Sequence, residues 1–151
     1  MRTAGDLKRF SLLVDFCDED REELLALLEE KSLMAGRSLF REGTEAESLV
    51  LLLSGSVQLK SARAGELGRV GEGSALGAVS LVSVGPREAT AIAETPCEVL
   101  LLPRTSFRRL VEDAPRTACR LSEAIARELA GLVRPGLDQL VAGDDMQSTT
   151  S

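Results

Sequence analysis

Gly77 and Arg87 are the residues of this chain whose types and spacing could do chemistry. A glycine lets the backbone turn sharply and approach a ligand without a Cβ in the way. The residues that follow, Ala78 to Val82, can form one short helical turn whose free N–H groups attract an anion. The guanidinium of Arg87 offers a fork of donors that matches phosphate oxygens. The segment Gly73–Glu94 therefore predicts a site for a single phosphate group.

Arg87 lies between a turn signal, Gly85-Pro86, and the alternating run Ala89–Ala93, which predicts a strand. Its alternative role is structural, as an internal ion pair with Glu88 or Glu72. The glycine has a plain alternative too, because a sharp turn needs glycine whether or not a ligand binds there.

This segment resembles the phosphate-binding cassette of the cyclic nucleotide-binding domain family, whose pattern is roughly F-G-E-L-A-L-x-x-x-x-P-R-x-A-T. The chain has Leu76-Gly77-Ala78-Val79-Ser80-Leu81, then Pro86-Arg87-Glu88-Ala89-Thr90. The spacing is closer to that of protein kinase A regulatory subunits than to that of catabolite activator protein. Gly36 to Gly43 resembles the family's G-x-x-I/L-F-x-x-G hairpin, and Leu51 to Gln58 resembles its L-x-x-G-x-V strand pair. The likeness covers roughly Phe10 to Val133.

The resemblance implies a ligand site with cyclic AMP or cyclic GMP as the candidate ligand. Its residues would be Gly77, Ala78, Val79, Ser80, Arg87, Glu88, Ala89 and Thr90. In such a site Arg87 pairs with the ligand phosphate, and the N–H groups of Ala78 and Val79 hold another oxygen. The last helix closes over the base.

Two residues depart from the family pattern. Ala78 stands where the family has the acidic residue that accepts a hydrogen bond from the ribose 2′-hydroxyl, and Glu88 stands where a small residue is expected. An inward-facing carboxylate beside the phosphate would oppose it by ~1 kcal/mol or more. We therefore expect weak or absent binding of ordinary cyclic nucleotides.

Glycines punctuate the chain between residues 32 and 102, with short apolar runs between them. This pattern argues for an antiparallel sandwich or barrel. The run Leu49–Leu53 is unbroken, which suits a strand covered on both faces. The expected strands are Ser32–Ala35, Ser38–Arg41, Leu49–Leu53, Val57–Ser61, Leu67–Val70, Ala89–Ala93 and Glu98–Leu102. The resemblance implies the same class, a mainly β, jelly-roll-like antiparallel β-roll with an N-terminal helix and two C-terminal helices.

Helical patterns flank this region at both ends. The expected helices are one capped by Asp18 or Asp20 and ending near Lys31, one over Ser106–Glu112 capped by Thr105, and one over Pro115–Val133. We expect one domain over residues 10–134 and a flexible C-terminal tail over residues 135–151. Met1 to Asp6 is expected to be loose.

The last helix has two candidate roles. Ala118, Ile125 and Leu132 lie seven residues apart, but Glu128 interrupts the companion row. The resemblance implies a homodimer seam through Pro115–Val133, as in bacterial transcription factors of the family. The alternative is that this helix simply packs on its own sheet.

Histidine is absent, which removes Ser-His-Asp, Cys-His and His-metal arrangements. Cys17, Cys97 and Cys119 lack C-x-x-C spacing, and this favours reduced, mostly buried thiols over a disulfide framework or a zinc site. The acidic residues from Asp18 to Glu23 suit the first turn of a helix. We expect neither an enzyme nor a metal site, and no cofactor.

The net charge of −6 and the pI near 4.8 disfavour direct nucleic-acid binding. No apolar run approaches the ~20 residues that span a bilayer, and the N-terminus lacks the apolar core of a signal peptide. A cytoplasmic location is therefore expected. The chain ends where transcription factors of the family carry a helix-turn-helix, so a stand-alone domain is expected.

Two functions from different classes remain. The first is a ligand sensor that binds a cyclic nucleotide or a related phosphate ligand and passes a signal to a protein partner. The second is a degenerate domain that kept the fold as an interaction or dimerisation module and lost the ligand. Ala78 and Glu88 favour the second, whereas Gly77, Pro86 and Arg87 favour the first.

Overall fold

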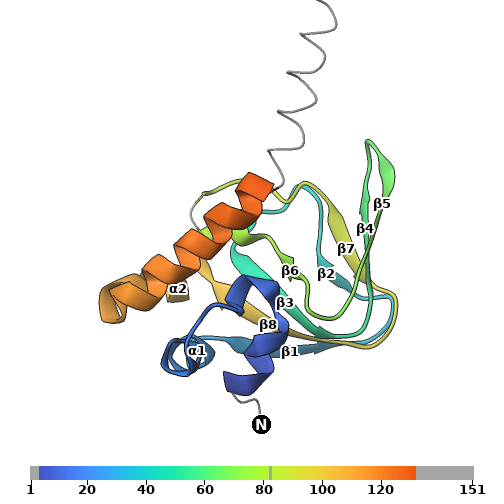
Figure 1. The fold of residues 1–151 in the computed structure, drawn as a ribbon. Helices are drawn as coiled ribbons and strands as arrows, with labels where there is room; N and C mark the ends of the chain where they lie inside the picture. The colour runs from blue at the N-terminus through green and yellow to red at the C-terminus, as the bar shows by residue number, and fades with distance from the viewer. Residues whose placement is uncertain (1–3, 82, 132–151) are drawn as a thin grey trace, which may run out of the picture.

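The computed structural model describes residues 4–81 and 83–131 as two antiparallel four-stranded sheets flanked by helices (Figure 1). The sheets have the orders β1-β8-β3-β6 and β2-β7-β4-β5. The strands are β1 (Glu29–Leu33), β2 (Ser38–Phe40), β3 (Ser48–Ser54), β4 (Val57–Ser61), β5 (Gly65–Val70), β6 (Ala75–Leu76), β7 (Thr90–Ala93) and β8 (Cys97–Pro103). The expected antiparallel β-roll is confirmed.

The helical elements gather against the β1-β8-β3-β6 sheet, on the side away from the second sheet (Figure 1). They are η1 (Ala4–Arg9), η2 (Ser11–Leu13), α1 (Asp18–Leu25), η3 (Ala78–Leu81) and α2 (Arg104–Asp113). Residues 115–131 form a further helix, called the C-terminal helix below. The expected helices at both ends of the roll are thus present.

Strand β3 is buried on both faces, as the apolar run Leu49–Leu53 predicts. Its odd-numbered residues from Leu49 to Leu53 belong to the core beneath the helices. Its even-numbered residues, Val50 and Leu52, belong to the core between the two sheets. The period of two along a strand sends successive side chains to opposite faces, so one strand supplies both cores.

The expected helix over the first acidic segment is shorter than predicted. Helix α1 ends at Leu25, and Lys31 lies in β1 rather than at a helix end. Strand β1 pairs along its length with the apolar β8, in a register that places Lys31 opposite Val99. This ladder overrides the helical preference of the Glu-Glu-Lys sequence, because tertiary pairing outweighs local propensity.

Two further boundaries were predicted wrongly. Helix α2 begins at Arg104 with Pro103 as its N-cap, so Thr105 lies inside the first turn and does not cap it. The cause is that β8 runs directly into the helix, with the Arg104 N–H donating to the Glu47 carbonyl oxygen. At the N-terminus, η1 begins at Ala4, and Leu7 is fully buried in the core beneath the helices.

The apolar face of the C-terminal helix is used within this chain. Ala118, Leu121 and Ile125 lie in the same core as α1 and β3, whereas Leu129 is 37% exposed. Leu132 and the expected tail lie outside the described residues. A homodimer through this helix stays a prediction, and among the described residues it would have to use the outer face.

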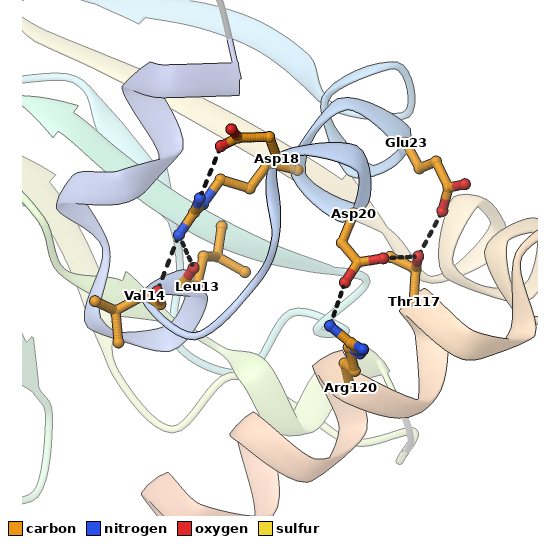
Figure 2. Close-up of polar contacts among 8 residues, drawn as sticks. Leu13, Val14, Asp18, Asp20, Glu23, Thr117 and Arg120 are labelled. Carbon is orange, nitrogen blue, oxygen red and sulfur yellow. Dashed lines mark hydrogen bonds and ion pairs between the residues drawn. The ribbon is translucent and has the colours of Figure 1, made fainter.

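Polar contacts fix the start of the C-terminal helix to α1 (Figure 2). Asp20 and Thr117 are buried, and the Thr117 hydroxyl lies 2.9 Å from Asp20 Oδ1 and 2.5 Å from Glu23 Oε2. Arg120 Nη1 donates to Asp20 Oδ2 at 2.8 Å. Burial alone would raise the pKa of Asp20, but hydrogen bonds from Cys17 and Thr117 and the charge of Arg120 outweigh it and lower the pKa.

The far end of the C-terminal helix is held more loosely. Arg127 Nη1 lies 3.3 Å from Asp15 Oδ2, and both side chains are largely exposed. Ser11 and Glu128 approach only to 3.5 Å. Exposed pairs of this kind contribute ~0–1 kcal/mol.

The three cysteines have different surroundings. Cys97 is buried, as expected, but Cys17 and Cys119 are exposed, so the expectation of mostly buried thiols is wrong. Cys17 is the N-cap of α1, so the expected cap, Asp18 or Asp20, is wrong, because both lie inside the first turn. Cys119 lies on the outer side of the C-terminal helix. None of the helices in the described ranges is long and apolar enough to cross a membrane.

We expect Leu51→Ala in β3 to lower the free energy of unfolding by about 2–5 kcal/mol, because it leaves a cavity at a fully buried position. Urea unfolding measures the change. The matched control is Leu67→Ala in β5, whose side chain is 53% exposed and whose loss should change stability by less than ~0.5 kcal/mol. Equal effects of the two changes would contradict the assignment of β3 to the core.

We expect Asp20→Asn to cost about 1.5–3 kcal/mol at pH 7, because it removes the charge from a buried hydrogen-bonded group. A lowered folded pKa gives stability that is present above the usual value of 3.8 and is lost as pH falls through the folded value. The difference between wild type and variant should therefore shrink below pH 4. Asp18→Asn, at a side chain that is 79% exposed, is the control. A difference that stays constant with pH would contradict the assignment.

Candidate functional site

A pocket of about 460 Å³ lies where β2, β4 and β6 meet the turn η3 and the loop before β7. Its volume is within the ~300–1,000 Å³ that is typical of small-molecule sites. The pocket is lined by Phe40, Ala46, Leu59, Leu76, Gly77, Ser80, Ser83, Gly85, Pro86, Arg87, Glu88 and Ala89. Most of these side chains are apolar or small, and Arg87 is the one cation among them.

Gly77 is required at the head of η3 for two reasons. Its φ of +75° lies in the left-handed region that favours glycine. A Cβ at this position would overlap Arg87 Nη1 and lie 3.2 Å from the Ser48 carbonyl oxygen. The glycine thus lets the guanidinium lie directly against the backbone of the turn, and the two predicted site residues are in contact.

Arg87 is only 8% exposed, and among the described residues it forms no ion pair, although the charge of Glu47 acts on it. Nη2 donates to the Ser48 carbonyl oxygen at 2.9 Å, and the guanidinium carbon lies 4.2 Å from the centroid of the Phe40 ring. The alternative of an ion pair with Glu72 is wrong, since Glu72 pairs with Arg9 at 2.9 Å. Glu88 is exposed, and the contacts of the Arg87 guanidinium are with Ser48 and Phe40 instead. The Phe40 ring and the Ser48 carbonyl oxygen orient the Arg87 guanidinium without neutralising its charge.

Burial leaves the charge of Arg87 poorly solvated. It lowers the pKa of this guanidinium from its usual value, and the negative charge of Glu47 offsets part of that effect. An arginine remains protonated in proteins, so the side chain stays a cation at the pocket wall. An anion in the pocket would add to the partial counter-charge that Glu47 provides.

The other predicted site residues divide into two groups. Ser80, Glu88 and Ala89 line the pocket beside Gly77 and Arg87. Ser80 is buried and its hydroxyl donates to the Gly77 carbonyl oxygen at 2.5 Å, whereas Glu88 is exposed. The Glu88 charge therefore stands in water at the rim, not inside the pocket.

Ala78 and Thr90 do not line the pocket. Ala78 packs against the core beneath the helices. The Thr90 hydroxyl accepts a hydrogen bond from the Glu42 N–H at 2.9 Å, which joins the loop after β2 to β7. Val79 lies in η3, and its side chain is outside the described structure.

Three residues that matter here were missed from the sequence. Phe40 lies on a predicted strand, and its aromatic type was the available signal. Ser48 acts through its backbone carbonyl oxygen, which every residue type has, so the sequence carries no signal for it. Arg104, the first residue of α2, contacts η3 by donating from Nε to the Ser80 carbonyl oxygen at 2.7 Å. No pattern in the sequence distinguishes it from the exposed arginines of the same helix.

The C-terminal helix contributes no residue from its described part, 115–131, to the pocket lining. The resemblance implied a last helix closed over the ligand, and this arrangement differs. The helix lies instead along α1 and η2, where Thr117 and Arg120 hold its first turns (Figure 2). Within the described residues, no part of this helix therefore covers the pocket.

The β-roll with a glycine and arginine site beside a short turn defines a class of ligand-binding regulatory domains, and comparison with known proteins agrees. The family described as the cyclic nucleotide-binding domain matches residues 30–114, more than half of the chain. The chain therefore belongs to the cyclic nucleotide-binding domain family.

Relatives of this chain occur in proteins of different kinds. A lysophospholipase of Neurospora crassa is 28% identical over 152 residues, covering 95% of this chain and 9% of that protein. The N-terminal domain of a transcriptional regulator from Streptomyces coelicolor is 33% identical with a TM-score of 0.74, covering 84% of this chain and 94% of that structure. The catabolite activator protein of Thermus thermophilus is 28% identical with a TM-score of 0.71, covering 86% and 62%.

We expect Gly77→Ala to displace the Arg87 guanidinium and to abolish anion binding, because its Cβ overlaps Nη1. Gly65→Ala is a matched control, since Gly65 has a similar φ of +72° with nothing within 4 Å of an added Cβ. Each change should cost ~1–2 kcal/mol of stability from the left-handed backbone alone. Calorimetric titration with cyclic nucleotides distinguishes the two variants, because only Gly77→Ala should lose binding. Retained binding in Gly77→Ala would show that an added Cβ does not displace the Arg87 guanidinium from the site.

Proposed function

We propose that this chain is a regulatory sensor domain that binds a cyclic nucleotide, or a related phosphate ligand, with weak affinity. The observation that carries the proposal is the Arg87 guanidinium, which is buried at the wall of an open pocket without an ion pair to a described residue. The size of the pocket, its apolar lining and its single cation support a ligand with one negative charge and a flat apolar body.

The affinity is proposed to be weak because an acceptor for the ribose hydroxyl is missing. Ala78 has no hydrogen-bonding side chain and faces the core, so it cannot take the role of the family's acidic residue. A lost hydrogen bond to a charged group is worth ~1.5–3 kcal/mol, or about one to two decades in the dissociation constant. Glu88 adds little, because an exposed charge at the rim is screened by water.

A regulatory domain acts through another domain of the same protein or through a separate protein partner. The relatives include a lysophospholipase and a transcriptional regulator, and this chain spans 9% of the first. We propose that the domain itself is not catalytic and that a protein partner carries its output. The unpaired state of Cys17, Cys97 and Cys119 supports a reducing compartment such as the cytoplasm.

A second candidate function is an interaction or dimerisation module without a ligand. Two observations favour it: Ala78 packs in the core, and the C-terminal helix lies along α1 and not over the pocket. In this case the outer face of that helix is the first surface to test for a partner or a second copy of the chain.

We expect calorimetry with cyclic AMP and cyclic GMP to give dissociation constants above 1 μM for the wild-type chain. Arg87→Ala should weaken binding by at least tenfold, because a charge-assisted hydrogen bond is lost. The control is Arg63→Ala, which removes an exposed arginine outside the pocket. Submicromolar binding would contradict the weak site, and no binding of either nucleotide would favour the interaction module, which sedimentation then tests.

A further inference from the structure

Arg104 donates hydrogen bonds to backbone carbonyls of the pocket wall without lining the pocket itself. Its Nη2 donates to the Ala46 carbonyl oxygen at 2.5 Å and its Nε to the Ser80 carbonyl oxygen at 2.7 Å, and Nη2 also lies 3.5 Å from the Ser83 carbonyl oxygen. All three of these acceptor residues line the pocket, whereas Arg104 itself does not. The guanidinium, whose side chain is 14% exposed, therefore joins two parts of the wall that are distant in sequence.

The short segment 45–48 connects Arg104 to Arg87. Arg104 takes the carbonyls of Ala46 and, through its backbone N–H, of Glu47, while Arg87 takes the carbonyl of Ser48. The Ala46 N–H in turn donates to the Gly85 carbonyl oxygen at 2.9 Å. Two arginines thus bind the consecutive carbonyl groups of residues 46, 47 and 48, a segment called the strap below.

The geometry requires arginine at position 104. A planar guanidinium presents Nε and Nη2 donors along one edge, so it can serve two carbonyl groups from different segments at once. A lysine ammonium keeps the charge but lacks this fixed fork. The nearby Glu45 carboxylate lies 3.8 Å from Nη1 and is 53% exposed, so the charge pair is secondary to the carbonyl contacts.

We propose that Arg104 is a positioning residue of the pocket, which holds the strap and the Ser80 carbonyl in place. The effect on ligand affinity rests on the proposed function, but the holding of the wall does not. A ligand that contacts Arg87 and η3 also depends on the position of the strap and of the Ser80 carbonyl. Because linkage is reciprocal, loosening Arg104 lowers ligand affinity.

The test uses Arg104→Lys in the full chain, with Arg109→Lys as the matched control on the exposed face of the same helix. Without ligand, native-state hydrogen exchange at the Ala46 and Arg87 amides should be at least tenfold faster in Arg104→Lys and unchanged in Arg109→Lys. Both amides form backbone hydrogen bonds within the strap region. Unchanged exchange in Arg104→Lys would overturn the positioning role.

With cyclic AMP and cyclic GMP as probes, Arg104→Lys should bind about tenfold more weakly than the wild type, whereas Arg109→Lys should bind equally well. Equal affinity of Arg104→Lys and the wild type would overturn the effect on ligand binding. If neither nucleotide binds the wild type, the proposed function and that effect fail, while the ligand-free exchange still decides whether Arg104 positions the wall.

Discussion

The burial of β3 on both faces is the constraint on which the rest of this molecule depends. Leu49, Leu51 and Leu53 anchor the helices, and Val50 and Leu52 anchor the second sheet. The same strand pairs with β6, placing Leu76 opposite Val50, and Gly77 follows directly. Strand β3, which belongs to both cores, therefore fixes the position of Gly77 and of the start of η3.

The pocket is organised around a cation that the protein holds without an ion pair to a described carboxylate. Phe40 stacks on Arg87, and backbone carbonyls of residues 46, 48 and 80 receive the guanidinium groups of Arg87 and Arg104. Neutral acceptors orient a guanidinium while leaving its charge available. This explains how a buried arginine is tolerated with only partial counter-charge from Glu47 nearby.

Much of the β-roll was predictable, because Leu49–Leu53 is long, apolar and free of charge. Strand β1 was predicted only in part, as Ser32–Ala35, since Glu29 to Lys31 have the composition of an exposed edge and gain their structure from pairing with β8. Within the site, Gly77 and Arg87 were found from residue type and spacing. Ser48 was not, because it acts through its backbone carbonyl oxygen, which any residue type provides. Arg104 was not, because its acceptors are backbone carbonyls of residues distant in sequence, which form no motif with it.

The C-terminal helix is attached unevenly along its length. Its first turns carry the buried Thr117 and Ala118 and the 2.8 Å contact between Arg120 and Asp20, whereas Arg127 and Asp15 meet in solvent at 3.3 Å. Mobile ions screen an exposed pair much more than a buried one. Raising the ionic strength should therefore weaken the contact of Arg127 with Asp15 more than that of Arg120 with the buried Asp20, so salt acts on one part of this helix and spares the part that packs on α1.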